Sequence, residues 1–206
     1  MKLLAVSTSD KSPSAAVLTE DGRVIEGIDE SGRAHSVSLA SLVEDTLDRA
    51  GLSVSDMDAF AVDVGPGSFT GVRIGVSFVN ALAYATGKPV FAVTSLHALR
   101  RLARGEGSER VCALLDARNG NGYAAVFDGE SCIEPPCACV VEELVSALPA
   151  DTVFVGSAMG RSDSVRAGLV IEEARRMSER DAVSTATPLY LRPSQAERIA
   201  AERGGA

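Results

Sequence analysis

The residues best placed to do chemistry form a glycine-rich turn at positions 65–73, which reads GPGSFTGVR. The turn follows an apolar run at 59–62 and precedes a helix-like run at 72–85, so a strand ends and a helix begins there. Glycine permits unusual backbone angles, and Ser68 or Thr70 can cap the helix. Free amides and the helix dipole could bind a phosphate at such a turn. The turn lacks the Gly-Lys-Ser/Thr of a Walker loop and the third glycine of a dinucleotide loop, so a purely structural elbow is the other interpretation.

Charged residues near the end of a predicted strand are a second candidate. Asp116 and Arg118 follow an apolar run, and Arg73 closes the glycine-rich turn. An acid at a strand end beside an arginine could bind a substrate. An internal ion pair explains the same residues, and the sequence leaves both interpretations open.

Metal and disulfide chemistry are not indicated by the cysteines and histidines. The four cysteines are Cys112, Cys132, Cys137 and Cys139. They form no Cys-x-x-Cys pair and lack the density of a secreted disulfide scaffold. With only His35 and His97 available, we expect no zinc site, and we expect buried or idle thiols.

The charge of the chain argues against direct binding of nucleic acid. It has 20 Lys and Arg against 28 Asp and Glu, a formal net charge of -8. A protein that binds nucleic acid by itself normally displays a basic face, because phosphate neutralisation supplies most of the affinity. Aromatic residues make up only 4% of the chain, so a base-stacking platform is not expected. The arginines Arg100, Arg101 and Arg104 are interpreted as a solvated face at the end of a helix.

Periodicity and turn signals predict an α/β domain in the first half of the chain. The predicted elements are strands at 2–7, 14–19 and 23–28, a helix at 36–50, a strand at 58–64, a helix at 70–86 and a strand at 90–94. Asp21-Gly22 is a hairpin signal between the second and third strands. Ser36 is placed to cap the first helix and Gly51 to end it.

A polar segment at 105–108 indicates a boundary between two lobes, which we place at 1–106 and 107–206. The elements predicted in the second lobe are strands at 110–116, 123–127 and 131–133, a helix at 140–148 and a strand at 152–156. Residues 194–203 alternate charges with alanines, which predicts an exposed helix. No run approaches the ~18 apolar residues of a membrane span, and the start of the chain lacks the features of a signal peptide. We therefore expect a cytoplasmic protein without membrane contact.

Several segments of the chain resemble the TsaB (YeaZ) family, the partner proteins of the TsaD transferase in bacterial synthesis of threonylcarbamoyladenosine on tRNA. The matching segments are GPGSFTGVR at 65–73, LLAVSTS at 3–9, His35-Ser36, LDAR at 115–118 and PLYLR at 188–192. The resemblance implies an α/β fold of the actin-like/Hsp70/sugar-kinase (ASKHA) class, with two lobes of mixed sheets and helices and a reduced second lobe. Where the family usually has a Glu before the tyrosine of the middle motif, this chain has Asn121-Gly122, so no role is carried over to that loop.

The resemblance implies a non-catalytic scaffold rather than an independent enzyme. Such a scaffold is required for transfer of the threonylcarbamoyl group to adenosine 37 of tRNAs that read codons starting with A. Ser7 stands where kinases of the superfamily have an aspartate, and Leu39 stands where TsaD has the second histidine of a His-x-x-x-His pair. Asp10 is either a turn-former or a substitute metal ligand. Residues 156–160 are a candidate nucleotide site, because they resemble the segment where a kinase of this fold seats adenosine. We expect no catalytic residue, no metal and no cofactor.

The alternative is an ATP-dependent enzyme or a peptidase of the same fold that acts on its own. The partners implied by the family are a TsaD-like transferase in a heterodimer and a TsaE-like ATPase. Self-association of the isolated chain stays open, and tRNA is expected to bind only through the complex.

The helix after the glycine-rich turn carries the predicted partner surface. It has a narrow polar stripe, and an apolar remainder that one sheet face cannot cover. Gly71 and Gly75, four residues apart, would let another helix approach, whereas packing against the 36–50 helix of the same chain is the alternative. The family resemblance favours a helical bundle shared with TsaD. The predicted interface residues are His35, Leu39, Val43, Gly71, Arg73, Gly75, Val76, Val79 and Leu82.

Overall fold

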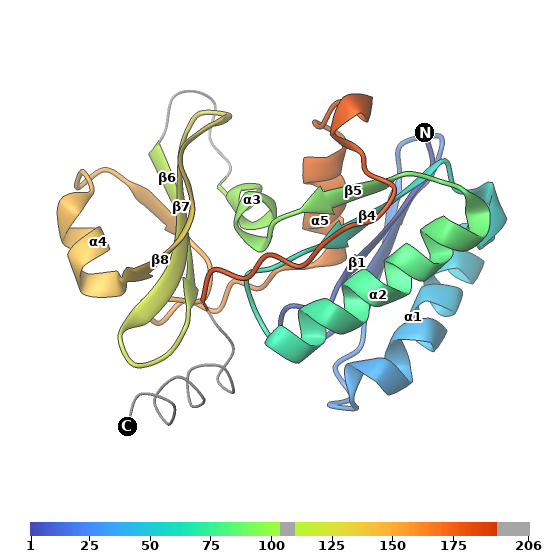
Figure 1. The fold of residues 1–206 in the computed structure, drawn as a ribbon, viewed down its shortest axis with the longest axis horizontal. Helices are drawn as coiled ribbons and strands as arrows, with labels where there is room; N and C mark the ends of the chain where they lie inside the picture. Colours follow the sequence, from blue (N-terminus) through green and yellow to red (C-terminus); the bar gives the residue numbers. More distant parts are fainter. Residues whose placement is uncertain (104–109, 193–206) are drawn as a thin grey trace, which may run out of the picture.

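The computed structural model describes residues 1–103 and 110–192 of the chain. Its first sheet has five strands in the order β3-β2-β1-β4-β5 (Figure 1). The strands are β1 (Leu3–Ser7), β2 (Ser14–Leu18), β3 (Val24–Ile28), β4 (Ala59–Asp63) and β5 (Val90–Val93). Strands β1 to β3 form an antiparallel meander, and β4 and β5 continue the sheet in parallel with β1. The central strands read as continuous apolar runs because helices cover both faces of the sheet.

The second sheet has four strands in the order β8-β7-β6-β9. The strands are β6 (Arg110–Asp116), β7 (Asn121–Asp128), β8 (Ser131–Val140) and β9 (Val153–Val155). The β6-β7-β8 meander is antiparallel, and β9 joins β6 in parallel. This sheet repeats part of the first one, as predicted from the element order.

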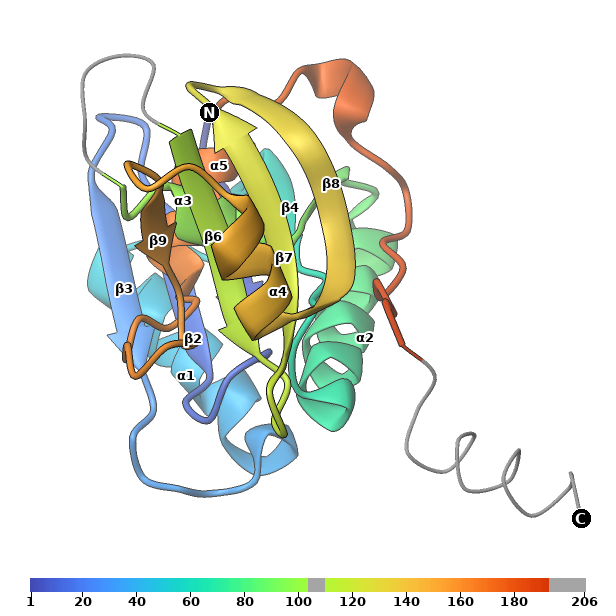
Figure 2. The ribbon, with the colours of Figure 1, turned by 90° about the vertical axis from the view of Figure 1, so that its left-hand side faces the viewer.

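Helices separate and cover the two sheets (Figures 1 and 2). The helices are α1 (His35–Ala50), α2 (Phe69–Thr86), α3 (Ser95–Arg100), α4 (Val141–Ala147) and α5 (Ala167–Ala174), with short 3-10 turns at Val54–Asp56 and Glu179–Asp181. Helices α1 and α2 share a core with one face of the first sheet. Helices α3 and α5 pack between the two sheets, and α4 covers the outer face of the second.

The two mixed sheets and the β-β-β-α-β-α-β order give the predicted actin-like α/β fold. Two elements differ from the sequence-based prediction. Strand β8 runs on through Pro135 and Pro136 instead of ending at 133, which is tolerated because β8 is an edge strand and needs no donor on its outer side. Helix α5 was not predicted; it is short and begins after Arg166, which provides no side-chain cap.

The division into lobes at 1–106 and 107–206 stays a prediction. The two sheets lie on either side of residues 104–109, yet α5 packs on β1 and β2 of the first sheet. The segment 183–192 also returns to the first sheet, where Val183 bridges to Val90. The predicted helix at 194–203 lies outside the described residues. Among the described residues, no helix combines the length and the apolar character needed to cross a membrane.

The helix ends agree with the predicted signals except at the start of α1. Ser68 accepts a hydrogen bond from the Gly71 amide and caps α2 as predicted. Gly51 ends α1 in the left-handed conformation. The predicted cap by Ser36 is wrong, because α1 begins one residue earlier, after Ala34, and has no side-chain cap.

The interpretation as a solvated face is also wrong for Arg100 and Arg101, whereas Arg104 lies outside the described residues. Arg100 is buried, and its guanidinium donates to the carbonyl oxygen of Gly129. Arg101 forms ion pairs with Glu130, on the β7–β8 turn, and with Glu173 of α5. These arginines therefore join α3 to the second sheet and to α5.

Candidate partner-binding site

Asp63, the last residue of β4, holds the glycine-rich turn from inside. Its carboxylate accepts hydrogen bonds from the hydroxyls of Ser7 (2.9 Å), Ser95 (2.6 Å) and Ser9, and from the amide of Gly65 (2.9 Å). The side chain is fully buried, and burial raises the pKa of Asp63 while these hydrogen bonds act in the opposite direction. Sequence reasoning missed this residue. The available signal was an acid that ends an apolar strand directly before the turn.

The contacts of the turn favour the structural elbow over a phosphate site. The Gly65 amide is engaged by Asp63, the Ser68 amide donates to the Ser9 carbonyl oxygen (2.8 Å), and the Gly71 amide donates to the Ser68 hydroxyl (3.2 Å). The buried carboxylate of Asp63 beneath the turn would also oppose a second anion.

The glycines of α2 allow close contact with the chain's own β1 end rather than with another subunit. A Cβ on Gly71 would collide with the carbonyl oxygen of Thr8, and one on Gly75 would collide with the Thr8 hydroxyl. That hydroxyl donates to the Gly71 carbonyl oxygen (2.7 Å), and Val79, further along the same face, has no exposed surface. The Gly71/Gly75/Val79 face thus packs inside the chain, as the alternative interpretation held.

Three more of the predicted interface residues are also interior. Leu39, Val43 and Val76 lie in the core that joins α1 and α2 to the first sheet, each with 3% or less of its surface exposed. We correct their placement: they support the helices from within. The remaining predicted residues, His35, Arg73 and Leu82, reach the surface.

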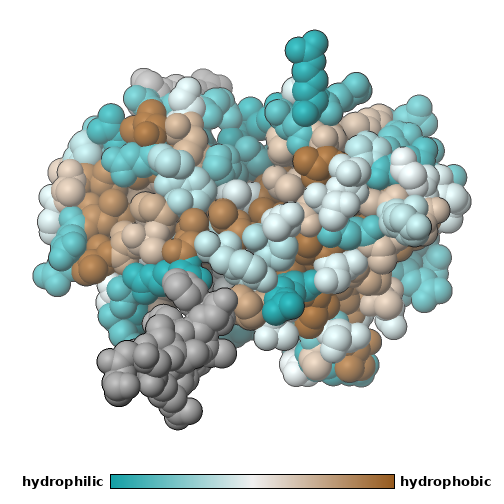
Figure 3. All heavy atoms as spheres, in the orientation of Figure 1, coloured by the Kyte–Doolittle hydropathy of each residue, from teal (hydrophilic) through white to brown (hydrophobic). Residues whose placement is uncertain are grey.

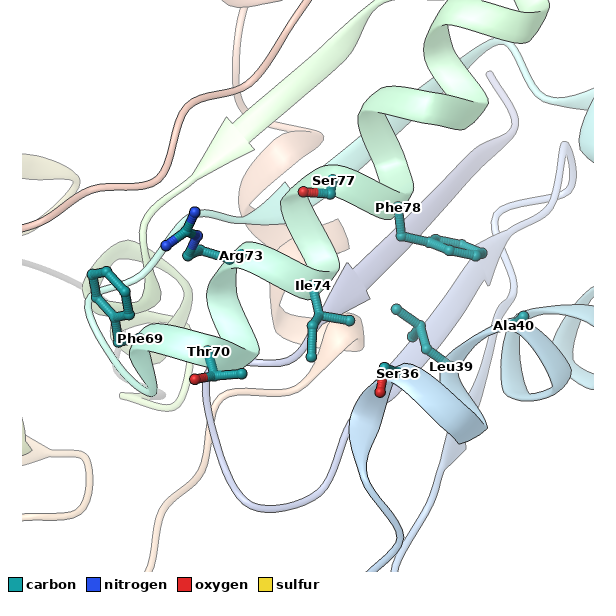
Figure 4. A pocket seen from close by; sticks show the side chains of 9 residues that line it. All are labelled: Ser36, Leu39, Ala40, Phe69, Thr70, Arg73, Ile74, Ser77 and Phe78. Carbon is teal, nitrogen blue, oxygen red and sulfur yellow. The ribbon is translucent and has the colours of Figure 1, made fainter.

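An open groove runs between α1 and α2 on the outer surface. This α1–α2 groove has a volume of about 510 Å³ and is lined by Ser36, Leu39, Ala40, Phe69, Thr70, Arg73, Ile74, Ser77 and Phe78. Ile74 and Phe78 point from α2 toward α1, while Arg73 and Phe69 lie on the other side of α2 (Figure 4). In the space-filling view, hydrophobic atoms lie beside hydrophilic ones over the N-terminal half of α2 (Figure 3).

A second groove lies on the opposite side of α2, against residues 186–190, which we call the strap. This α2–strap groove has a volume of about 460 Å³. Asn80 fixes the strap, because its amide donates to the Ala186 carbonyl oxygen (2.9 Å) and its oxygen accepts from the Ala186 amide (2.8 Å). Phe69 stacks on Tyr190 at the end of the groove, with ring centroids 4.8 Å apart. The strap overlaps the motif at 188–192 that the sequence analysis singled out.

Asp116 and Arg118 do not form the internal ion pair that the sequence allowed. The Asp116 carboxylate accepts from the backbone amide of Arg118 (2.8 Å), and no ion pair in the described part of the chain includes Asp116. Asp10 accepts from the amide of Lys11 (2.7 Å), as a turn-former does. The loop at 156–160 is tied to Asp163 through the Gly156 amide (3.1 Å).

The remaining titratable groups do not gather at these grooves. The Nε2 atom of His35 lies 3.0 Å from the Lys11 carbonyl oxygen. Burial raises the pKa of the Cys112 thiol to about 12, in line with an idle thiol. Cys132 and Cys137 are exposed free thiols, so of the expected buried or idle thiols these two are not buried. Residues 1–103 and 110–192 hold no cluster of three or more His, Cys, Asp or Glu side chains that could bind a metal ion.

Comparison with known proteins gives one consistent family. The family model described as TsaD, tRNA N6-adenosine threonylcarbamoyltransferase, matches residues 28–149. The tRNA threonylcarbamoyladenosine biosynthesis protein TsaB of Escherichia coli (strain K12) is 33% identical over 169 residues, which are 76% of this chain and 71% of the relative. The TsaB protein of Bacillus subtilis (strain 168) is 34% identical, over 62% of this chain and 55% of the relative. The structure of YeaZ from Pseudomonas aeruginosa superposes with a TM-score of 0.77 at 32% identity, covering 92% of this chain and 99% of that one.

Proposed function

We propose, from the premise that this chain belongs to the TsaB (YeaZ) family, that it is a non-catalytic partner of a TsaD-like transferase. The complex would transfer the threonylcarbamoyl group to adenosine 37 of tRNAs that read codons starting with A. The observation that carries the proposal is the open groove between α1 and α2, whose lining is mainly apolar. Apolar surface of this kind, rimmed by polar side chains, marks protein interaction sites.

The shape of the two helices explains how a partner would bind. Their inner faces are committed to the first sheet, so only the outer residues of α1 and α2 are free to contact another chain. Val37 of α1 is 66% exposed and Tyr84 of α2 is 92% exposed. A helical hairpin laid across these residues would complete a bundle, because α1 and α2 present neighbouring ridges with a groove between them.

The buried polar contacts favour a non-catalytic role over independent catalysis. Ser7 stands where superfamily kinases have an aspartate, and its hydroxyl is already committed to Asp63. Asp63 is itself saturated by four donors, so it is not an open ligand for a metal or substrate.

The net charge of -8 supports binding of tRNA only through the complex. We extend the proposal to a TsaE-like ATPase as a further member of the complex and to a cytoplasmic location. A homodimer of the isolated chain would use the same α1–α2 surface and would compete with the transferase.

The test is binding of the purified chain to the TsaD-like transferase of the same cell. We expect Ala40→Arg, which places a long cation in the α1–α2 groove, to weaken the complex at least tenfold. Ala147→Arg, the same change at an exposed position of α4, is the matched control and should bind as the unchanged chain does. Calorimetry gives the affinities, and thermal unfolding confirms that both variants fold.

Two results would contradict the proposal. Failure of the unchanged chain to bind the transferase would remove the partner role. ATP or peptide hydrolysis by the chain alone, surviving repurification, would support the independent enzyme instead.

A further inference from the structure

Arg73 occupies a special place on α2, because it lines both grooves. It projects from the ridge that separates the α1–α2 groove from the α2–strap groove. Its guanidinium carbon lies 5.4 Å from the centroid of the Phe69 ring, and Phe69 in turn stacks on Tyr190. The stack holds the exposed guanidinium over an aromatic surface rather than leaving it to sample all rotamers.

Arg73 is also the single charged residue among those that line the two grooves. Some other arginines of the described chain form ion pairs, such as Arg101 with Glu130 and Glu173 and Arg23 with Asp21. No carboxylate within residues 1–103 and 110–192 lies within ion-pair distance of Arg73. The chain has 28 acidic and 20 basic residues. A single cation on an otherwise uncharged surface of such a chain favours a partner that carries a negative charge at the matching position.

A partner that covers both grooves must also cover Arg73. Burying an arginine without an acceptor is costly, whereas its planar fork binds a carboxylate through two parallel hydrogen bonds. Arginine and aromatic side chains in a dry centre are also the residues that dominate binding energy at interfaces.

We propose that Arg73, held by Phe69 and Tyr190, is the recognition residue of this surface and binds a carboxylate on an otherwise apolar helix of the partner. The inference rests on the proposed function, and it adds that the strap takes part in the interface through Tyr190. The partner helix lies over the ridge of α2, with its apolar side chains in the grooves and an Asp or Glu above Arg73.

The experiment measures affinity for the TsaD-like transferase with Arg73 variants of the full chain. We expect Arg73→Gln to weaken binding about tenfold and Arg73→Glu about a hundredfold, since the second adds repulsion. The control Arg175→Glu makes the same charge change at an exposed residue directly after α5, on the opposite face of the first sheet, and should bind as the unchanged chain does. Affinity of the unchanged chain should fall with salt more steeply than that of Arg73→Gln.

A charge exchange identifies the acceptor. One Asp or Glu of the partner, replaced by Arg, should restore binding of Arg73→Glu and weaken binding of the unchanged chain. The double variant Glu197→Gln/Glu202→Gln of the full chain tests whether the acceptor of Arg73 belongs to the same chain. The affinity of this variant for the transferase should depend on Arg73 as that of the unchanged chain does.

The outcomes separate this inference from the function on which it rests. If both Arg73 variants bind normally while Ala40→Arg does not, the interface exists and the role of Arg73 is overturned. Loss of the Arg73 dependence in the Glu197/Glu202 variant overturns it as well, because the acceptor would then belong to the same chain. If the unchanged chain does not bind at all, the proposed function fails first.

Discussion

At the scale of single residues, Asp63 shows how one buried side chain shapes the functional surface. Its carboxylate joins β1, the segment after β1 and the start of α3 through three serine hydroxyls. The same carboxylate fixes the Gly65 amide, at the start of the turn that leads into α2. The orientation of Phe69 and Arg73 at the start of α2 therefore depends on a side chain that has no exposed surface.

The first prediction concerns this residue. Asp63→Ala should reduce the free energy of unfolding by about 3 kcal/mol or more, because it leaves the buried Ser95 hydroxyl and the buried Gly65 amide without an acceptor. Urea denaturation measures the change. Asp151→Ala, at an exposed turn, is the control and should leave the midpoint unchanged. Equal midpoints for the two variants would show that the Asp63 cluster contributes little to stability.

At the scale of elements, the sequence predicted where α2 begins and ends better than which way it faces. The turn residues and Ser68 predict the start, and the predicted end at residue 86 agrees with the observed end before Gly87. The polar stripe of α2 is exposed at Arg73, Ser77 and Tyr84. The orientation of the glycines could not be predicted, because two small residues four apart suit the approach of a partner helix and the approach of Thr8 equally well.

The second prediction separates the inner and outer faces of α2. Val79→Arg should unfold or aggregate the chain, since it places an unpaired charge where no surface is exposed. Ala81→Arg, two residues on and exposed, should leave the unfolding temperature within a few degrees of the unchanged chain. Circular dichroism during heating gives both values. A stable Val79→Arg monomer would mean that the helix can turn its inner face outward.

At the scale of the whole molecule, long-range packing determines contacts that could not be predicted from the sequence. The β-strand pattern gave both sheets, yet helix α5 returns from the second half of the chain to pack on β1 and β2 of the first sheet. Local periodicity contains no information on that return. An ion pair between Arg101 and Glu173 accompanies the return of α5 to the first sheet. Because the two residues are far apart in the sequence, local patterns do not relate them.

The third prediction follows from the ion pairs that connect the two sheets. Arg101 Nε lies 2.8 Å from Glu173 Oε2 on α5, and Arg101 Nη2 lies 2.7 Å from Glu130 Oε2 on the β7–β8 turn. Arg101→Met should reduce the free energy of unfolding at pH 7 by about 2 kcal/mol, less than for a fully buried pair because Glu130 is exposed. Glu173→Gln in the Arg101→Met chain should restore part of the loss, because it removes the carboxylate left without its partner.

The loss caused by Arg101→Met should depend on pH in a defined direction. Burial already raises the pKa of Glu173, so its ionisation opposes folding as the pH rises through that pKa. Without Arg101 the pKa of Glu173 rises further, and ionisation of Glu173 at neutral pH lowers the free energy of unfolding by more. Arg101 also lowers the pKa of Glu130, a stabilising effect that is lost as the pH falls. Both effects make the two chains converge in stability below the ordinary pKa of glutamate, which urea denaturation from pH 7 to pH 4 would show. A constant difference across that range would mean that Arg101 acts through packing of its side chain rather than through its ion pairs.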